Sequence, residues 1–183
     1  TFQNLKNMLS NYPDRECKVF LLHGDMTDEE MHSLYQHEKI SALLALPHGE
    51  GFGLPIFEAA YSSLPVIATG WSGQLDFLVD SNGKDQFYNV SFDIQPVQKE
   101  VVWDGVIVPD SMWAYPREAS AKEQMRLCYE DITNGVNRWD NSEITERFSQ
   151  EKMYKKFVDE VLGFDSSLIE VQESQEEEVL EFE

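Results

Sequence analysis

The chain has 183 residues, which is enough for one domain and part of a second. Hydrophobic residues make up 42% of the sequence, so a core can form and wholesale disorder is excluded. The 34 acidic residues outnumber 14 Lys and Arg and give a formal net charge of -20, which argues against nucleic acid as the main ligand. The longest uncharged apolar run, residues 40–47, is far shorter than the roughly 20 residues that span a bilayer. We therefore expect no transmembrane segment and, without a visible secretory leader, a cytoplasmic protein.

The cysteines and the distribution of acids add two expectations. Cys17 and Cys128 lie far apart without metal-ligand spacing, so we expect reduced, packed thiols and no metal site. Residues 165–183 hold eight acids and no base, which supplies -8 of the charge and leaves -12 on the remainder. We expect a folded domain over residues 1–163 and a disordered acidic tail over 164–183.

Short apolar runs alternate with helical patterns in the first part of the chain. Thr27 and Glu30 form the capping box that starts a helix. The apolar runs have the composition of buried parallel strands. In chain order the pattern predicts a helix over 1–11, a strand over 19–22, a helix over 27–36 and a strand over 40–46.

The next unit contains two glycine turns, at residues 48–55 and 70–73. Each turn follows an apolar strand and precedes a helix, and this repetition is typical of a doubly wound α/β sheet. We therefore predict a Rossmann-like parallel sheet followed by C-terminal helices. The elements predicted from this unit onward are a helix over 55–62, a strand over 66–69, a short helix ending at 78, a strand over 87–94, an irregular stretch over 95–110, and helices over 116–132 and 145–162.

The first glycine turn has the features of an anion site. Glycines allow close backbone approach, and the start of the following helix presents unpaired N–H groups with about half a positive charge. Glu50 and Glu58 flank this turn. A carboxylate beside a phosphate is better suited to accept hydrogen bonds from sugar hydroxyls. From their spacing alone, a joint site and two independent solvated acids both remain open.

The string GEGFGLPIFEAAYSSLPVIAT, residues 49–69, resembles the donor-site signature of retaining glycosyltransferases of the GT-B fold. The resemblance is to the large group 1, family 4-like set, whose hallmark is two glutamates separated by seven residues, the spacing of Glu50 and Glu58. Residues 19–35 and the segment beginning at Trp113 are also similar to that family. This resemblance implies the C-terminal, donor-binding part of a glycosyltransferase whose first elements and acceptor-binding N-terminal domain are missing, and which is inactive alone.

The resemblance also implies roles for individual residues. The resemblance implies that Glu50 is the catalytic residue and contacts hydroxyls of the transferred sugar. The amides of Gly53 and Leu54 hold the donor diphosphate, and Glu58 accepts hydrogen bonds from the ribose. The full donor-binding set is Glu58, Gly51, Phe52, Gly53 and Leu54, and further candidates are His48, His23, Trp71, Ser72 and Gly73.

Some of these candidates also have structural interpretations. His48 can be a surface or capping group, His23 an ordinary turn residue, and Trp71 a packing residue. Asp76 stands where the family usually has glutamate, which leaves its role open.

The implied reaction transfers a sugar from a nucleotide-diphosphate sugar to an acceptor hydroxyl with retention of configuration. No metal clamp is visible, so we expect a metal-independent donor site without a cofactor. The arginine and lysine that the family places early in this domain have no counterpart here. The alternative is a non-catalytic nucleotide-sugar-binding or scaffolding module.

Overall fold

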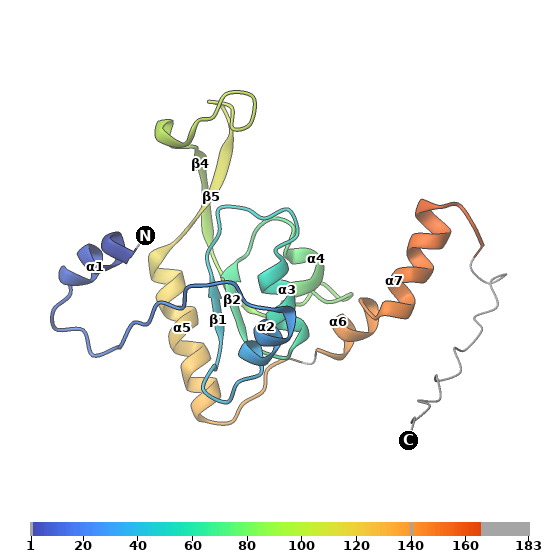
Figure 1. Cartoon of the computed structure of the whole chain (residues 1–183), viewed down its shortest axis with the longest axis horizontal. Coiled ribbons are helices and arrows are strands. Elements are labelled where there is room, and N and C mark those ends of the chain that lie inside the picture. Colours follow the sequence, from blue (N-terminus) through green and yellow to red (C-terminus); the bar gives the residue numbers. More distant parts are fainter. Residues whose placement is uncertain (1, 140, 166–183) are drawn as a thin grey trace, which may run out of the picture.

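The computed structural model describes residues 2–139 and 141–165 (Figure 1). Its centre is a parallel sheet of three strands in the order β1-β2-β3. β1 (Leu43–Ala45), β2 (Val66–Thr69) and β3 (Tyr88–Val90) run in the same direction. In the register, Leu44 lies opposite Ile67, and Ala68 lies opposite Asn89.

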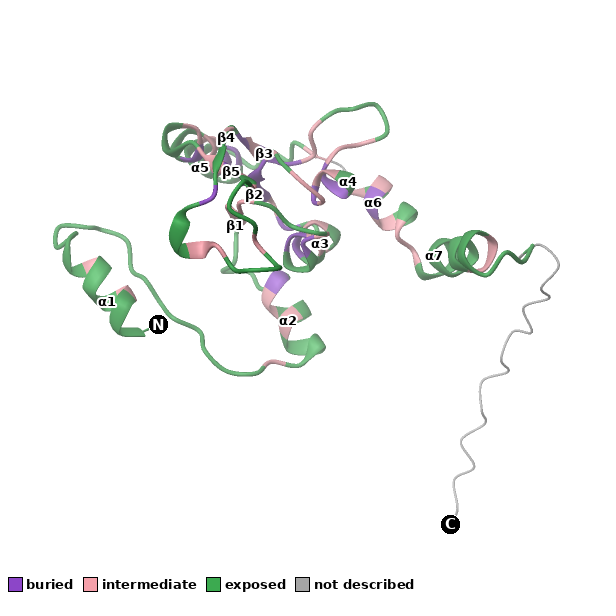
Figure 2. Ribbon diagram, turned by 90° about the horizontal axis from the view of Figure 1, so that it is seen from above, coloured by how far each residue is buried: buried purple, intermediate pink, exposed green. Residues whose placement is uncertain are grey.

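Helices pack on both faces of this sheet, as expected for a doubly wound fold. On one side α3 (Leu54–Tyr61) packs beside α2 (Asp28–Tyr35), while α5 (Glu118–Thr133) covers the other side (Figure 1). All four β2 residues are buried. Val66 and Ala68 join the core beneath α3, whereas Ile67 joins the core beneath α5. The predicted Rossmann-like architecture is confirmed, and buried residues gather around β2, α3 and α5 (Figure 2).

The remaining helices lie outside the two layers that cover the sheet. α4 (Leu75–Leu78) follows the second glycine turn, and α1 (Phe2–Ser10) has no buried residue. α6 (Ser142–Arg147) packs against α3 and is followed by α7 (Gln150–Lys156) and a π-helical turn, Phe157–Val161.

A two-stranded hairpin projects from the sheet (Figure 1). β4 (Phe92–Pro96) pairs antiparallel with β5 (Met112–Pro116), and a 3₁₀ turn at Lys99–Val101 lies between them. The prediction of one strand over 87–94 was therefore wrong. The chain leaves the parallel sheet at Ser91, whose amide binds Ser120 Oγ and whose carbonyl accepts from the Arg117 amide.

The prediction of a strand over 19–22 was also wrong. These residues form an irregular, exposed connection, and Phe20 is 85% exposed. Composition alone does not make a strand, because a strand needs a hydrogen-bonded neighbour, and the sheet pairs β1 only with β2.

The single helix predicted over 145–162 is divided. The first part is α6, whose C-cap is Phe148. Ser149 then caps α7 by accepting a hydrogen bond from the Lys152 amide. The strand predicted over 40–46 is limited to β1. The helices predicted over 1–11, 27–36, 55–62 and 116–132, the strand over 66–69 and the short helix ending at 78 are confirmed within about two residues, as boundary assignments allow.

The cysteine prediction holds for one residue. Cys128, on α5, is buried, but Cys17 is exposed in the connection before α2. Both thiols are free. The predicted acidic tail lies outside the described residues from position 166 onward.

Candidate functional site

The first glycine turn joins β1 to α3 at the carboxyl end of the sheet. Gly53 caps the helix with φ 89°, a left-handed conformation that favours glycine. Its carbonyl accepts hydrogen bonds from the Ile56 and Phe57 amides, and Pro55 occupies the first turn. No side chain caps this helix start. The turn therefore leaves its first backbone amides for a ligand.

The second glycine turn, after β2, is bonded directly to the first. The Ser72 hydroxyl donates to the Glu50 carbonyl at 2.7 Å and accepts from the Glu50 amide at 3.2 Å. The Gly73 amide also donates to the Glu50 carbonyl, at 3.1 Å. These three bonds fix the backbone of Glu50 while its side chain stays exposed.

The two turns also meet in van der Waals contact. A Cβ placed on Gly73 would lie 1.9 Å from the Gly51 carbonyl oxygen, which is a backbone atom. No side chain fits at that position. A Cβ on Gly51 would meet nothing within 4 Å.

The buried side chain of Gln74 packs against the second turn. Sequence analysis did not predict this role. The Gln74 side chain is fully buried, and its Nε2 donates to the Thr69 carbonyl at 3.0 Å. A Cβ on Gly53 would lie 3.7 Å from Gln74 Cβ, so the glutamine side chain packs under the start of α3. A lone glutamine after a glycine gives no sequence signal for such a position.

Glu50 and Glu58 border different parts of the surface. Glu58 is exposed on α3 and lines a hollow between α2 and α3 together with Tyr35, His32 and Tyr61. The lining of this hollow does not include Glu50. Burial, together with the charge of Glu58 and hydrogen bonding to it, raises the pKa of Tyr35 to about 12.

The other residues of the first turn divide between surface and core. Gly51 and Leu54 are exposed at the helix start. The Phe52 ring packs in the core against Phe57, Phe77 and Phe148, with centroid distances of 5.0 to 6.1 Å. Its side chain therefore anchors the turn to the core.

His48 connects the first turn to the hairpin. Its Nδ1 lies 2.8 Å from the Ala114 carbonyl oxygen, and the Ala114 amide donates to the His48 carbonyl. Because a carbonyl can only accept, Nδ1 carries the hydrogen. The ring stacks on Trp113 at 5.1 Å and packs against Tyr115 at 4.5 Å.

Trp71 lies beside the same turn. The residue is 40% exposed. Its ring packs against Phe92 with a centroid distance of 5.3 Å, and Nε1 lies 3.9 Å from where a Cβ on Gly49 would be. His23, in contrast, lines a separate hollow formed by the connection before α2 and by α2 itself.

Asp76 has a structural partner. Arg147 of α6 donates to its carbonyl oxygen and, at 2.7 Å, to its carboxylate Oδ1. The same guanidinium lies 4.9 Å from the Phe148 ring centroid. Asp76 thus connects α4 to α6.

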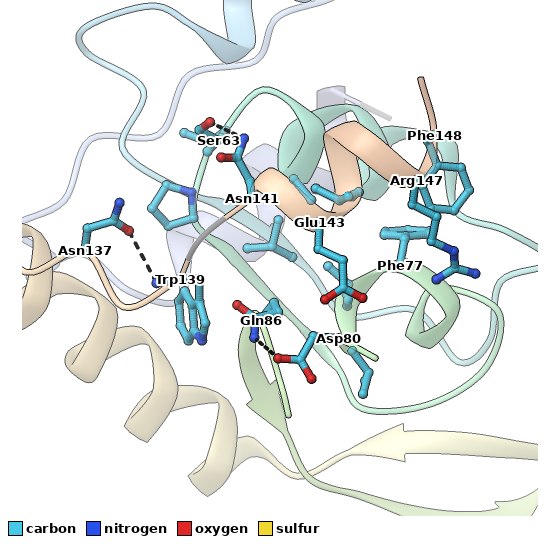
Figure 3. A pocket seen from close by; sticks show the side chains of 17 residues that line it. Ser63, Phe77, Asp80, Gln86, Asn137, Trp139, Asn141, Glu143, Arg147 and Phe148 are labelled. Atoms are coloured by element: carbon cyan, nitrogen blue, oxygen red, sulfur yellow. Dashed lines mark hydrogen bonds between the residues drawn. The ribbon is translucent and has the colours of Figure 1, made fainter. Parts of the chain in front are cut away.

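A further hollow lies at the opposite end of the strands (Figure 3). Pro65 and Gln86, just before β2 and β3, line it together with Trp139 and Ile144. Its volume of about 110 Å³ is below the range of about 300 to 1,000 Å³ that is usual for ligand pockets. This hollow is too small for a nucleotide.

The described part of the chain contains neither a cluster of metal-ligating side chains nor a helix that could span a membrane. Across residues 2–139 and 141–165, no group of three or more His, Cys, Asp or Glu side chains could hold a metal ion. In the same ranges no helix is long and apolar enough to cross a bilayer.

Two comparisons with known proteins found similar sequences. Residues 2–91 match the family model described as Glycosyl transferases group 1. Three curated Escherichia coli proteins, each described as the serotype-specific mannosyltransferase WbdA, are 41% identical to this chain over 64 residues. That stretch is 35% of this chain and 7 or 8% of each relative, so the match spans less than a tenth of the curated relatives. No solved structure gave a significant match.

The first half of the chain is thus similar to group 1 glycosyltransferases, and its parallel sheet is consistent with a partial Rossmann-like domain. Both glycine turns lie within the matched residues.

Proposed function

We propose that the two glycine turns bind a nucleotide-diphosphate sugar and that the protein transfers the sugar, with retention, to an acceptor hydroxyl. The observation that carries this proposal is the bonding of Ser72 and Gly73 to the Glu50 backbone beside the open start of α3. This arrangement puts a carboxylate next to a helix start that suits phosphate.

The donor diphosphate is bound by backbone amides. The amides of Gly53 and Leu54 face it at the start of α3, where the helix carries about half a positive charge. A chain with a net charge of -20 can bind an anion in this way without side-chain cations. As the leaving diphosphate gains charge, these fixed dipoles stabilise it without a metal ion.

The two glutamates bind hydroxyl groups. Glu50 accepts hydrogen bonds from the transferred sugar, and Glu58 accepts them from the ribose. A carboxylate has about four lone-pair positions, so the contact of Glu58 with Tyr35 leaves room for ribose hydroxyls.

In the reaction, the bond from the anomeric carbon to the diphosphate oxygen breaks and a bond to the acceptor oxygen forms on the same face. The acceptor's hydroxyl proton leaves with the diphosphate. The name of the curated relatives makes mannose the sugar to test first. We also propose that a further domain binds the acceptor and that the residues described here are inactive alone.

A calorimetric titration tests donor binding. The protein is titrated with UDP, GDP, ADP and their mannose conjugates, and Glu58→Ala is compared with Glu123→Ala, which removes an exposed helical carboxylate on α5. We expect saturable binding of one nucleotide that is weakened only by Glu58→Ala. Binding that both variants leave unchanged would contradict the role of Glu58.

The stereochemistry needs its own assay. The intact protein is supplied with the mannose conjugate that binds and with mannobiose, and NMR reads the anomeric configuration of the product. Retention is expected. Nucleotide binding without transfer would instead favour a non-catalytic module.

A further inference from the structure

Two residues at the end of α6 contact the structure behind both glycine turns. Arg147 is the last residue of α6, and Phe148 is its C-cap. Both line the hollow shown in Figure 3. Arg147 binds to α4, which follows the second turn, whereas Phe148 packs against the ring of Phe52 in the first turn.

A chain of hydrogen bonds joins Arg147 to the backbone of Glu50. The Arg147 guanidinium donates to the carboxylate of Asp76, at 2.7 Å, and to the Asp76 carbonyl oxygen. The Asp76 amide donates to the Gly73 carbonyl at 3.1 Å, and the Gly73 amide donates to the Glu50 carbonyl at 3.1 Å. These successive contacts connect α6 to the residue that is placed at the transferred sugar in the proposed reaction.

The short helix α4 depends on this contact for its position. It has only four residues, and a helix of that length is not stable without tertiary contacts. The last carbonyl groups of a helix lack partners within it, and the Asp76 carbonyl accepts a hydrogen bond from Arg147 instead. The position of α4, and through it that of Gly73, is therefore set in part by α6.

The contact of α6 with the first turn is aromatic. The centroid of the Phe148 ring lies 6.1 Å from that of Phe52 and 5.0 Å from that of Phe57 on α3. The Arg147 guanidinium lies 4.9 Å from the Phe148 centroid, within the range of a cation–π contact. One guanidinium thus contacts both the ring that packs on the first turn and the carboxylate that follows the second turn.

We propose that Arg147 is a positioning residue for the donor site, which holds Asp76 and Phe148 together and so keeps the two glycine turns in the arrangement that binds the nucleotide-diphosphate sugar. The inference rests on the proposed function and adds a residue that lies outside both turns and outside the residues matched by the family model. The ion pair of Arg147 with Asp76 is about half exposed, so it contributes little to overall stability. Its loss lowers the population of binding-competent turns, and the apparent donor affinity falls by the same factor.

Arg117 provides a matched control. It forms an ion pair with Asp93 through two hydrogen bonds at the base of the hairpin, with similar exposure and without contact to α4 or α6. The intact protein is titrated by calorimetry with UDP-, GDP- and ADP-mannose. Arg147→Ala should weaken binding of the conjugate that the wild type binds about fivefold, whereas Arg117→Ala should leave it unchanged.

Unfolding in denaturant, measured in parallel, separates positioning from a general loss of structure. Both variants should lose little stability, because each removes one exposed ion pair. Unchanged donor affinity in Arg147→Ala would overturn the proposal. So would a loss of affinity that is accompanied by a much larger loss of stability than in Arg117→Ala.

A double-mutant cycle tests whether Arg147 acts through Asp76. Asp76→Ala should also weaken donor binding, and the double variant should bind donor about as weakly as Arg147→Ala alone, because both changes break the same contact. Losses that multiply in the double variant would show that the two residues act independently and would overturn the proposal.

A measurement without donor distinguishes this inference from the proposed function. The amide NMR signals of Glu50 and Gly73 are compared in the unliganded wild type, Arg147→Ala and Arg117→Ala. Shifts of both amides in Arg147→Ala alone support the coupling of α6 to the turns, even if the wild type binds none of the mannose conjugates and the donor proposal fails. Unchanged signals of both amides would overturn the coupling even if a donor binds.

Discussion

The Ser72 hydroxyl is bonded to both backbone polar groups of Glu50, donating to its carbonyl and accepting from its amide. The two residues are 22 positions apart in the sequence. Through this contact, the turn after β2 sets the position of the turn after β1. The orientation of the Glu50 carboxylate therefore depends on a side chain from the neighbouring loop.

Ser72→Ala should loosen the first turn. Loss of both bonds should lower the free energy of unfolding by about 1 to 2 kcal/mol and weaken binding of the nucleotide sugar about tenfold. Denaturant unfolding and calorimetry measure the two effects. Ser81→Ala is the control, because that hydroxyl bonds to Glu143, away from the turns, so donor affinity should not change. Equal donor affinity in both variants would show that the bond to Glu50 is dispensable.

Gly73→Ala should destabilise the protein strongly. The added Cβ would lie 1.9 Å from the Gly51 carbonyl oxygen, so the two turns must separate. We expect a loss of about 2 to 3 kcal/mol or more, with a lower Tm in thermal unfolding. Gly51→Ala should be nearly neutral for stability, because its Cβ meets open space. A wild-type Tm for Gly73→Ala would contradict the close packing of the turns.

Asp131 should make stability depend on pH in the acidic range. Hydrogen bonds from Arg138, and a further one from Tyr88 at 2.9 Å, hold the pKa of the Asp131 carboxyl below its ordinary value. Its stabilising effect is therefore complete above the unfolded pKa of about 3.9 and is lost as the pH falls through the lower folded pKa. Denaturant midpoints are measured from neutral pH into the acid range. The midpoint concentration should decrease once the pH is lowered past about 4.

Asp131→Asn checks the assignment. The variant should be less stable than wild type at neutral pH and should lose less stability on acidification. Asp93→Asn is the comparison, because its ion pair with Arg117 is exposed and should contribute less. If the stability of Asp131→Asn fell with pH as steeply as that of wild type, the Asp131 carboxyl would not be the cause of the acid destabilisation.

The two cysteines should differ in reactivity. Cys17 is exposed, whereas Cys128 is buried, and burial raises the pKa of its thiol. Restricted access and the raised pKa both slow the reaction of Cys128. A thiol reagent should label one cysteine rapidly in the native protein and both in denaturant. Cys17→Ser should remove the fast phase. Two fast thiols in the native state would contradict the burial of the Cys128 side chain on α5.

The sequence predicted the centre of the fold because its elements are defined locally. All four residues of 66–69 are buried and three of them are apolar, and the capping box at Thr27 is complete within four residues. The division of residues 87–96 between two sheets depends instead on bonds from Ser91 to Ser120 and Arg117. Such long-range bonds leave no trace in the alternation of residues along a strand.

The candidate site shows the same limit. The glycine turns and their glutamates are visible in the sequence, but the bonding of Ser72 to Glu50 is not. The pattern could not show that Phe52 points into the core or that His23 lies on another hollow. It also gave no signal for the buried amide of Gln74 under the start of α3.

The most direct measurement of donor binding at the glycine turns is a residue-resolved NMR titration with the mannose conjugate of the nucleotide that binds. We predict that the largest amide shifts occur at Gly51, Gly53 and Leu54, with secondary shifts at Ser72 and Gly73. Shifts confined to the hollow near Pro65 and Trp139, or no shifts at the turns at saturation, would contradict the account.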